Sequence, residues 1–424
     1  MNSQINKISK IEYPKLLILL FPILLVTGPF LPDLSVFLLI LFYFYDFLNL
    51  TDKEKKKEIN FFKKKEIKLF LFFYFVIVLH SIFSDYLTYS LKTSLFYIRF
   101  LLFAIALRFY FSRMSKLDFK ILLFVLYFIF AILNLDAFIQ YFTGKNLTGY
   151  EISGGIRLGG LFGDELILGS YLSRFIPVVF GLLIYVYSDR LDKYALIGFL
   201  LFFFTEIVIF LSGERAAFFF TNLAALFLII SLKKFNLIRL SIVCLSFLAI
   251  IILSSFNDTS KKRIIDKTVD QIGINDEKKY IFSKHHSRIY NSTWIIFEEN
   301  NFMGIGPKNL RKYCNQKNLP ELDCYSHPHN HYLQILVEGG LIAFLIYCYA
   351  FIFLIYQILK HLFLKFFKNR YLFNDVQLCF MSCLLILFWP LIPNGNLFNN
   401  WINCIFFYQI GLFLWSFQDY KKDD

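Results

Sequence analysis

Residues 121–140 read ILLFVLYFIFAILNLDAFIQ, and Asp136 is the only charged side chain in this run. An apolar segment of about 20 residues is long enough to cross the roughly 30 Å hydrocarbon core of a membrane as an α-helix. Because lipid offers no hydrogen bonds, a backbone that crosses it must satisfy its polar groups within the segment. The stretch therefore predicts a transmembrane helix.

Similar apolar runs recur from one end of the 424-residue chain to the other. The composition is 57% hydrophobic with 56 phenylalanines, and the mean hydropathy is +0.56, which excludes a soluble globular protein. The sequence predicts an all-α, polytopic integral membrane protein with about twelve transmembrane helices. We expect them near residues 15–32, 33–50, 69–84, 93–111, 121–140, 164–187, 194–212, 216–232, 238–256, 333–358, 372–392 and 400–418.

These runs divide the chain into three parts. Residues 1–256 contain the first nine expected transmembrane helices, and residues 333–424 contain the last three. Between them, residues 257–332 form a long polar loop, in which residues 286–301 have the apolar spacing of a short amphipathic helix. We expect this loop to carry short helices of its own.

The net charge of +13 is not spread evenly along the chain. Lysine and arginine concentrate in short segments between apolar runs, of which residues 51–68 are the densest. That distribution argues against nucleic-acid binding and is typical of cytoplasmic loops. Counting helices from this side places both termini in the cytoplasm and residues 257–332 outside, and long loops cross a membrane largely regardless of charge.

The segment HPHNHYLQ (327–334) places His327, His329 and His331 on alternate positions just before an apolar run. An imidazole takes up a proton near neutral pH, so it suits a general base. The plainer alternative is that these histidines only decorate the end of a polar loop. Because Pro328 stiffens the segment, we favour a functional role.

A metal site is another interpretation of the same histidines. Its further ligands would be His285, His286, Cys314 and Cys324, but the spacing matches no zinc pattern. We expect Cys314 and Cys324 to form a disulfide instead, since both are predicted to lie in an oxidising compartment.

Arginines recur near the predicted external face, where Arg157, Arg174, Arg215 and Arg288 border or enter apolar runs. Charged groups at such places are costly and usually functional, and the planar guanidinium suits phosphate oxygens. The alternative is that each arginine extends to the lipid head groups, or that Arg215 pairs with the adjacent Glu214. Several arginines on the side of the histidines favour an anionic ligand at the outer membrane surface.

Four stretches resemble the superfamily of bacterial O-antigen ligases and O-antigen polymerases. In HNHYLQILVEGGLIA (329–343), nine residues separate Asn330 from Gly340, and Ala343 stands where the family pattern has Gly, Thr or Tyr. The other three are SGERAAFF (212–219), SRIYNSTWIIFEENNFMGIGPKNL (287–310) and RLGGLFGDELILGSYL (157–172). The resemblance covers roughly residues 157–345.

The resemblance implies a GT-C-like glycosyltransferase of the bacterial inner membrane. It would move a glycan from undecaprenyl diphosphate to an acceptor, the lipid A core, at the periplasmic face, among membrane lipids and without a cofactor or a metal. By the same resemblance, His329 would be the general base, and Arg215 and Arg288, with Arg157, would bind the diphosphate. The expected supporting residues are Asn330, His331, His327, Glu338 and Gly340.

Other functions stay open at this point. An O-antigen polymerase would join the glycan to another lipid-linked repeat unit. A transporter or flippase of lipid-linked glycans would need polar groups strung through several helices, for which Asp136, Glu206, Asn134 and Gln140 are candidates. A non-catalytic scaffold gives no reason for grouping histidines with arginines. Replacing His329 with Ala should abolish transfer but leave the lipid-linked substrate translocated.

Overall fold

The computed structural model of the chain describes residues 2–155, 157–188, 191–233, 236–256, 261–262, 266, 269–270, 282–300, 303–317 and 325–418. Its architecture is all-helical, with isolated β-bridges such as Ser153–Arg157. The helices before the long loop are α1 (Asn2–Leu24), α2 (Phe30–Leu48), α3 (Asp52–Phe62), α4 (Lys65–Ile82), α5 (Leu87–Phe111), α6 (Lys116–Thr143), η1 (Gly160–Phe162), α7 (Leu168–Val186), α8 (Leu191–Ser212), α9 (Arg215–Ser231) and α10 (Asn236–Phe256). They are followed by α13 (Lys284–Glu299), α14 (Leu310–Lys317), α15 (His331–Lys368), α16 (Asp375–Phe388) and α17 (Asn400–Ser416).

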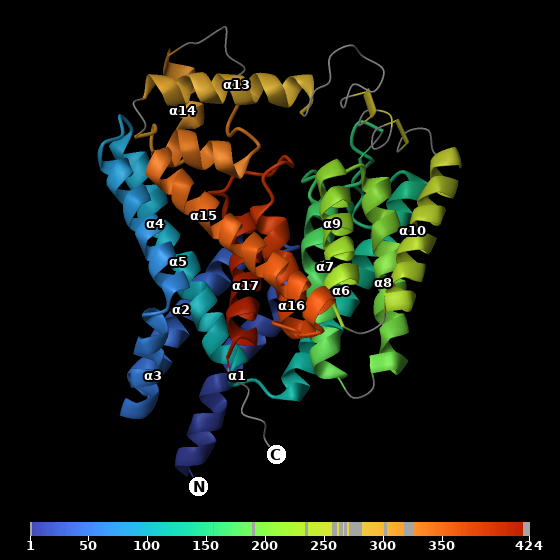
Figure 1. The fold of residues 1–424 in the computed structure, drawn as a ribbon, viewed down its shortest axis with the longest axis horizontal. Helices are drawn as coiled ribbons and strands as arrows, with labels where there is room; N and C mark the ends of the chain where they lie inside the picture. Colours follow the sequence, from blue (N-terminus) through green and yellow to red (C-terminus); the bar gives the residue numbers. More distant parts are fainter. Residues whose placement is uncertain are drawn as a thin grey trace.

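The long helices form one bundle whose two ends differ (Figure 1). Helices α13 and α14 lie across one end, which we call the loop end. Helix α1 begins, and α17 finishes, at the opposite end, as expected for termini that share one side of a membrane. Which end faces the cytoplasm stays a prediction.

The protein is a membrane protein by the length and composition of its helices. Among the described residues, six helices are long and apolar enough to cross a bilayer, namely α2, α5, α6, α7, α15 and the Tyr194–Ser212 part of α8. Each of the twelve predicted segments overlaps a helix, but the first, 15–32, runs past the end of α1 and into the start of α2, and some helices, such as α9 and α16, are short. The number of crossings therefore stays a prediction.

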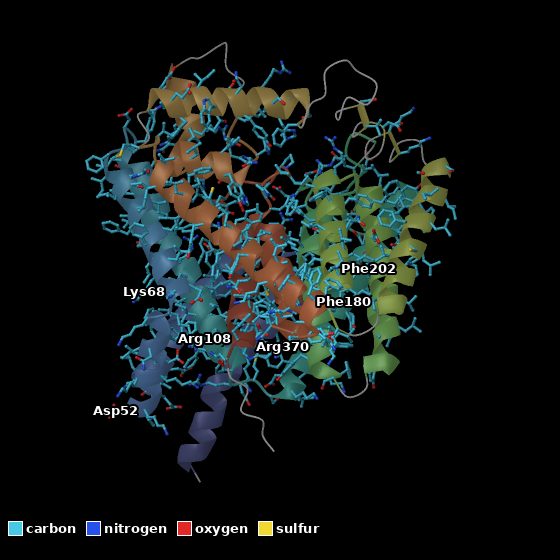
Figure 2. The ribbon with its side chains drawn as sticks, in the orientation of Figure 1. Asp52, Lys68, Arg108, Phe180, Phe202 and Arg370 are labelled. Carbon is cyan, nitrogen blue, oxygen red and sulfur yellow. The ribbon has the colours of Figure 1, made fainter. Side chains whose placement is uncertain are left out.

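Aromatic and ionic contacts join the helices of the bundle (Figure 2). Phe180 of α7 packs against Phe202 of α8, with ring centroids 6.2 Å apart. Toward the end opposite α13, the guanidinium of Arg108 in α5 pairs with Glu58, and both side chains are buried. This ion pair fixes the lysine-rich helix α3 to the bundle, because an unpaired buried charge would be strongly destabilising.

Helix α15 is two helical segments joined by a kink at Gly340, whose φ of 77° and ψ of 175° are not helical. The first segment lies across the loop end near α13, and the second crosses the bundle obliquely (Figure 1). A Cβ at Gly340 would lie 2.5 Å from both His80 Cε1 and the Met303 carbonyl oxygen. Only glycine fits this backbone and this close approach, so the kink depends on the expected supporting residue Gly340.

Candidate functional site

The segment before α15 is held in one conformation by contacts to the α16–α17 connection. Asn330 is the N-cap of α15: its side-chain oxygen accepts hydrogen bonds from the backbone N–H groups of Tyr332 and Leu333. Its amide group donates to the carbonyl of Pro390 at 2.8 Å. One residue earlier, the carbonyl of His329 accepts a 2.8 Å hydrogen bond from the backbone N–H of Asn394.

His329 has a left-handed backbone, with φ at 53°. This conformation is uncommon for a residue with a side chain, and it persists only where surrounding contacts impose it. Here the N-cap on one side and the bond from Asn394 on the other impose it. The backbone therefore aims the imidazole of His329 in a direction that an ordinary extended segment would not.

The imidazole of His329 lies in a cluster of aromatic rings from two parts of the chain. Its ring centroid is 4.1 Å from that of His327 and 5.9 Å from that of His286, which belongs to α13. Tyr325 contacts both His329, at 6.4 Å, and His285 of α13, at 5.1 Å. The amphipathic helix of the long loop therefore covers the histidine segment.

Burial keeps these imidazoles neutral. The pKa of His329 is lowered from its ordinary value by burial and then by the nearby His285. Burial lowers the pKa of His327 to about 4, with a further contribution from His329. Because these pKa values lie below the usual 6.5, the rings are unprotonated at neutral pH and can accept a proton.

Arg215, the first residue of α9, lies close to this cluster. The pKa of His286 is lowered to about 4 by burial, by the neighbouring imidazoles and, last, by the positive charge of Arg215. An electrostatic effect of this kind requires proximity. The predicted cation Arg215 and the predicted base His329, 114 positions apart in the sequence, thus have the imidazole of His286 as a common neighbour.

Glu214 organises the arginines beside α7. Its carboxylate accepts hydrogen bonds from the backbone N–H groups of Gly169, at 2.7 Å, and Ser170, at 3.1 Å, at the start of α7. Burial raises the pKa of Glu214 to about 7, although those hydrogen bonds and the nearby charges of Arg157 and Arg174 act to lower the pKa. Arg157 also donates to the carbonyl of Leu166 at 3.1 Å. Arg157 therefore lies with Glu214 near the start of α7.

Arg174, inside α7, is a buried cation that the side chain of Asn394 links to the histidine segment. Its side chain is held by the carbonyl of Ser170 at 2.9 Å and reaches the side-chain oxygen of Asn394 at 3.5 Å. Its Nε atom has no hydrogen-bond partner among the described residues. Since Asn394 also binds the backbone of His329, this residue connects the cation to the histidine.

The remaining predicted residues lie around this centre. His331 is buried, with Nε2 3.1 Å from the carbonyl of Gly395, and it packs against Phe406. Arg288 lies on α13, one turn after His285, with its side chain exposed. Glu338 is fully buried, which excludes an exposed helix-start acid.

Hydrogen bonds to the carboxylate of Glu338 connect the long loop to α15. The carboxylate accepts hydrogen bonds from the backbone N–H of Leu310, at 3.1 Å, and from the side chain of Gln334, at 2.9 Å. The backbone N–H of Ile305 donates to the carbonyl of Val337 at 2.8 Å. These contacts support α15 and the loop end rather than the imidazole of His329.

The alternative roles of the cysteines and histidines can be compared with the structure only in part. Cys314 is disulfide-bonded, and its expected partner Cys324 lies outside the described residues. Among the described cysteines, those at 244, 348, 379, 383 and 404 are not in a disulfide. Within the part of the chain that the structure describes, no group of three or more His, Cys, Asp or Glu side chains is arranged to hold a metal ion.

Two neighbours of the site were not among the residues expected to bind the diphosphate or to support the base, although Arg174 was noted among the arginines near the predicted external face. Arg174 carries a sequence signal, since a charge inside an apolar run is costly unless it has a function. Asn394 carries none, because it is one of several asparagines in the polar NGNLFNN (394–400) connection. Its role depends on α16 and α17 returning to the side of α15, which no local pattern indicates.

The geometry suits the transfer of a group that leaves as an anion. A neutral imidazole on a fixed backbone can take a proton from a hydroxyl. The guanidinium of Arg174, linked to His329 through Asn394, can bind phosphate oxygens and stabilise the negative charge that develops on them. The site lies where the bundle meets the loop, so a lipid-borne substrate could reach it from the membrane.

Comparison with known proteins gives one family match. Residues 195–348 match the family model described as O-Antigen ligase. The matched region begins in α8 and ends in α15, and it therefore contains Arg215, Arg288 and the histidine segment. No curated protein matches the chain.

Proposed function

Because the chain belongs to the O-antigen ligase and polymerase family, we propose that it transfers a glycan from undecaprenyl diphosphate to a hydroxyl of the lipid A core. The reaction takes place at the loop end, on the periplasmic face of the bacterial inner membrane. Energy for the transfer comes with the donor, since the sugar–diphosphate bond is broken in the reaction.

The reaction needs a base and a cation, and the site offers both. His329 takes the proton of the acceptor hydroxyl while the oxygen bonds to the anomeric carbon of the donor sugar. The bond from that carbon to the diphosphate oxygen breaks, and undecaprenyl diphosphate leaves with the electron pair. Arg215 and the buried Arg174 bind the diphosphate and stabilise its growing negative charge, with Arg157 and Arg288 as further cations.

One observation supports this proposal above the others: the constrained conformation of His329. Its left-handed backbone is fixed by Asn394, and its ring has a lowered pKa. A histidine that only decorated a loop would gain nothing from such a backbone. The constraint is the pattern expected of a base that must be oriented before the substrate arrives.

The test is the envelope glycan profile of a deletion strain, complemented with the wild-type gene or with His329→Ala. For a ligase, the deletion leaves the lipid A core bare while long glycan chains accumulate on the lipid carrier. Complementation with His329→Ala then does not restore the transfer of these chains to the core. Single repeat units on the core would indicate a polymerase instead. Lipid-linked glycan trapped on the cytoplasmic side would indicate a flippase. Full rescue by His329→Ala would refute the catalytic role of that residue.

A further inference from the structure

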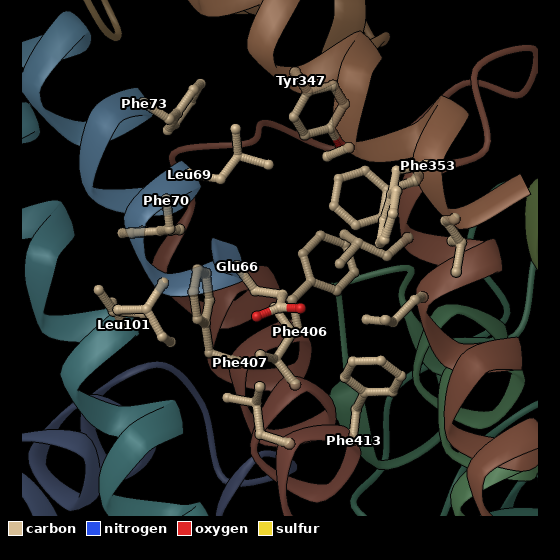
Figure 3. Close-up of a pocket in the computed structure, with 18 of the residues that line it drawn as sticks. Glu66, Leu69, Phe70, Phe73, Leu101, Tyr347, Phe353, Phe406, Phe407 and Phe413 are labelled. Carbon is tan, nitrogen blue, oxygen red and sulfur yellow. The ribbon is translucent and has the colours of Figure 1, made fainter. Parts of the chain in front are cut away.

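A cavity of about 560 Å³ lies inside the bundle, between α4 and α5 on one side and α15, α16 and α17 on the other (Figure 3). Its volume is in the range of small-molecule binding sites, roughly 300–1,000 Å³. The wall is dominated by apolar side chains, and aromatic rings surround the space. In Figure 3 the labelled rings are Phe70, Phe73, Tyr347, Phe353, Phe406, Phe407 and Phe413.

The wall has few polar groups, and one of them, the buried hydroxyl of Tyr347, has no hydrogen-bond partner among the described residues. Lys64 and Glu66 line the cavity where α4 begins, away from the loop end. Tyr97 donates a 3.1 Å hydrogen bond to the side-chain oxygen of Asn403. A polar ligand inside would lose its water without replacement, at a cost of several kcal/mol per group (about 2–7). Hydrocarbon is therefore the occupant that this wall accepts.

The cavity borders the candidate site, and residues of its wall contact residues of the site. Phe406 lines the cavity, and its ring centroid lies 6.0 Å from that of His331 and 5.7 Å from the guanidinium carbon of Arg174. Tyr347 also lines it and packs at 4.9 Å against Tyr332, two residues after the N-cap of α15. One ring thus separates the apolar space from the buried cation.

We propose that this cavity binds the isoprenoid chain of the polyprenyl diphosphate while the diphosphate lies at Arg174 and Arg215. The inference rests on the proposed function and adds the place where the lipid part of the substrate is held. A single chain of isoprene units suits one cavity between two groups of helices. The several acyl chains of a lipid A acceptor would need a wider opening.

The experiment measures the affinity of the purified full-length protein for two probes, undecaprenyl diphosphate and the short-chain geranyl diphosphate. Ala350→Trp fills the cavity, because Ala350 lines it. Ala131→Trp is the matched control, since Ala131 is exposed on the lipid-facing side of α6. Arg215→Ala reports on the head group.

We expect Ala350→Trp to weaken the binding of undecaprenyl diphosphate at least tenfold and to leave that of geranyl diphosphate unchanged. Ala131→Trp should change neither, and Arg215→Ala should weaken both. If Ala350→Trp binds undecaprenyl diphosphate like the wild type while Arg215→Ala still weakens both probes, the cavity assignment is wrong and the proposed function stands. If only Ala350→Trp has an effect, the cavity assignment stands and the diphosphate site is wrong.

A second measurement covers the case in which Ala350→Trp does not fold. A polyprenyl diphosphate with a photoreactive group on its chain is bound to the wild-type protein and cross-linked. Labelled peptides from α4, α15 and α17 support the proposal. Labelling confined to α6, α8 and α10, or a co-purified phospholipid that undecaprenyl diphosphate does not displace, overturns it.

Discussion

Replacing Gly340 with Ala tests how the kink of α15 builds the site. The φ of 77° and ψ of 175° lie in a region that residues with a side chain rarely occupy, which costs about 1–3 kcal/mol. The new methyl group would also lie 2.5 Å from the Met303 carbonyl oxygen and from His80. Overpacking of this kind costs about 1–3 kcal/mol, so the two effects together destabilise the fold by about 2–6 kcal/mol.

The neighbouring Gly339 supplies a matched control. Its backbone is helical, and a Cβ there would meet Ala343 Cβ at 3.2 Å and Ile335 at 3.6 Å. Alanine favours a helix over glycine by about 1 kcal/mol, which offsets the tight contact. We expect Gly339→Ala to stay within about 1 kcal/mol of the wild type.

The assay is the thermal unfolding of the purified protein in detergent, followed by the fraction that elutes as folded protein after heating. Gly340→Ala should melt well below the wild type, and Gly339→Ala close to it. Equal melting of the two variants, or a Gly340→Ala protein as stable as the wild type, would show that the kink is not imposed by contacts with Met303 and His80.

Further predictions concern charge and protonation. Burial lowers the pKa of His329 below its usual 6.5, and protonation removes the base. The rate of glycan transfer should therefore fall only when the pH drops below 6.5. A midpoint above pH 6.5 in the profile of kcat/KM against pH would contradict this. The pKa values of His286 and His327 are about 4 in the folded protein and higher in the unfolded chain, so the unfolded chain takes up protons more readily. The folded state should therefore lose stability as the pH falls from 6.5 to 4. In melting curves, His327→Ala should reduce this loss. Arg174→Ala should lower kcat/KM by about 10²-fold or more, with partial recovery in Arg174→Lys, and an unchanged rate would exclude Arg174 from the site.

The helical fold could be predicted from the sequence because lipid leaves few choices for the backbone. Hydropathy located most of the helices within several residues, although α1 begins 13 residues before the predicted segment and α15 ends 10 residues after it. The amphipathic spacing of residues 286–301 predicted α13. The kink at Gly340 was harder to predict from the sequence, since a Gly-Gly pair indicates close packing but not the direction of the chain. That direction is decided by Met303 and His80, which are distant in the sequence.

The candidate site was predictable in its chemistry more than in its geometry. The pattern around His329 and Arg215 indicated a base and a cation, and the structure brings the two near His286. Arg288 lies on α13, the helix of His286, with its side chain exposed, and its role in the site stays a prediction. The contribution of Asn394 depends on a backbone hydrogen bond across 65 positions, and backbone contacts of this range leave no mark in a single sequence.

Glycan transfer by the purified protein, with His329→Asn compared with the wild type, tests the central claim most directly. Asparagine tolerates the left-handed backbone at this position, so the substitution removes the base and keeps the segment in place. The donor is glycan-linked undecaprenyl diphosphate and the acceptor is lipid A core, both supplied in proteoliposomes. We expect the rate to fall by about 10²–10⁴-fold while undecaprenyl diphosphate still binds. Transfer by His329→Asn at the wild-type rate would contradict the account.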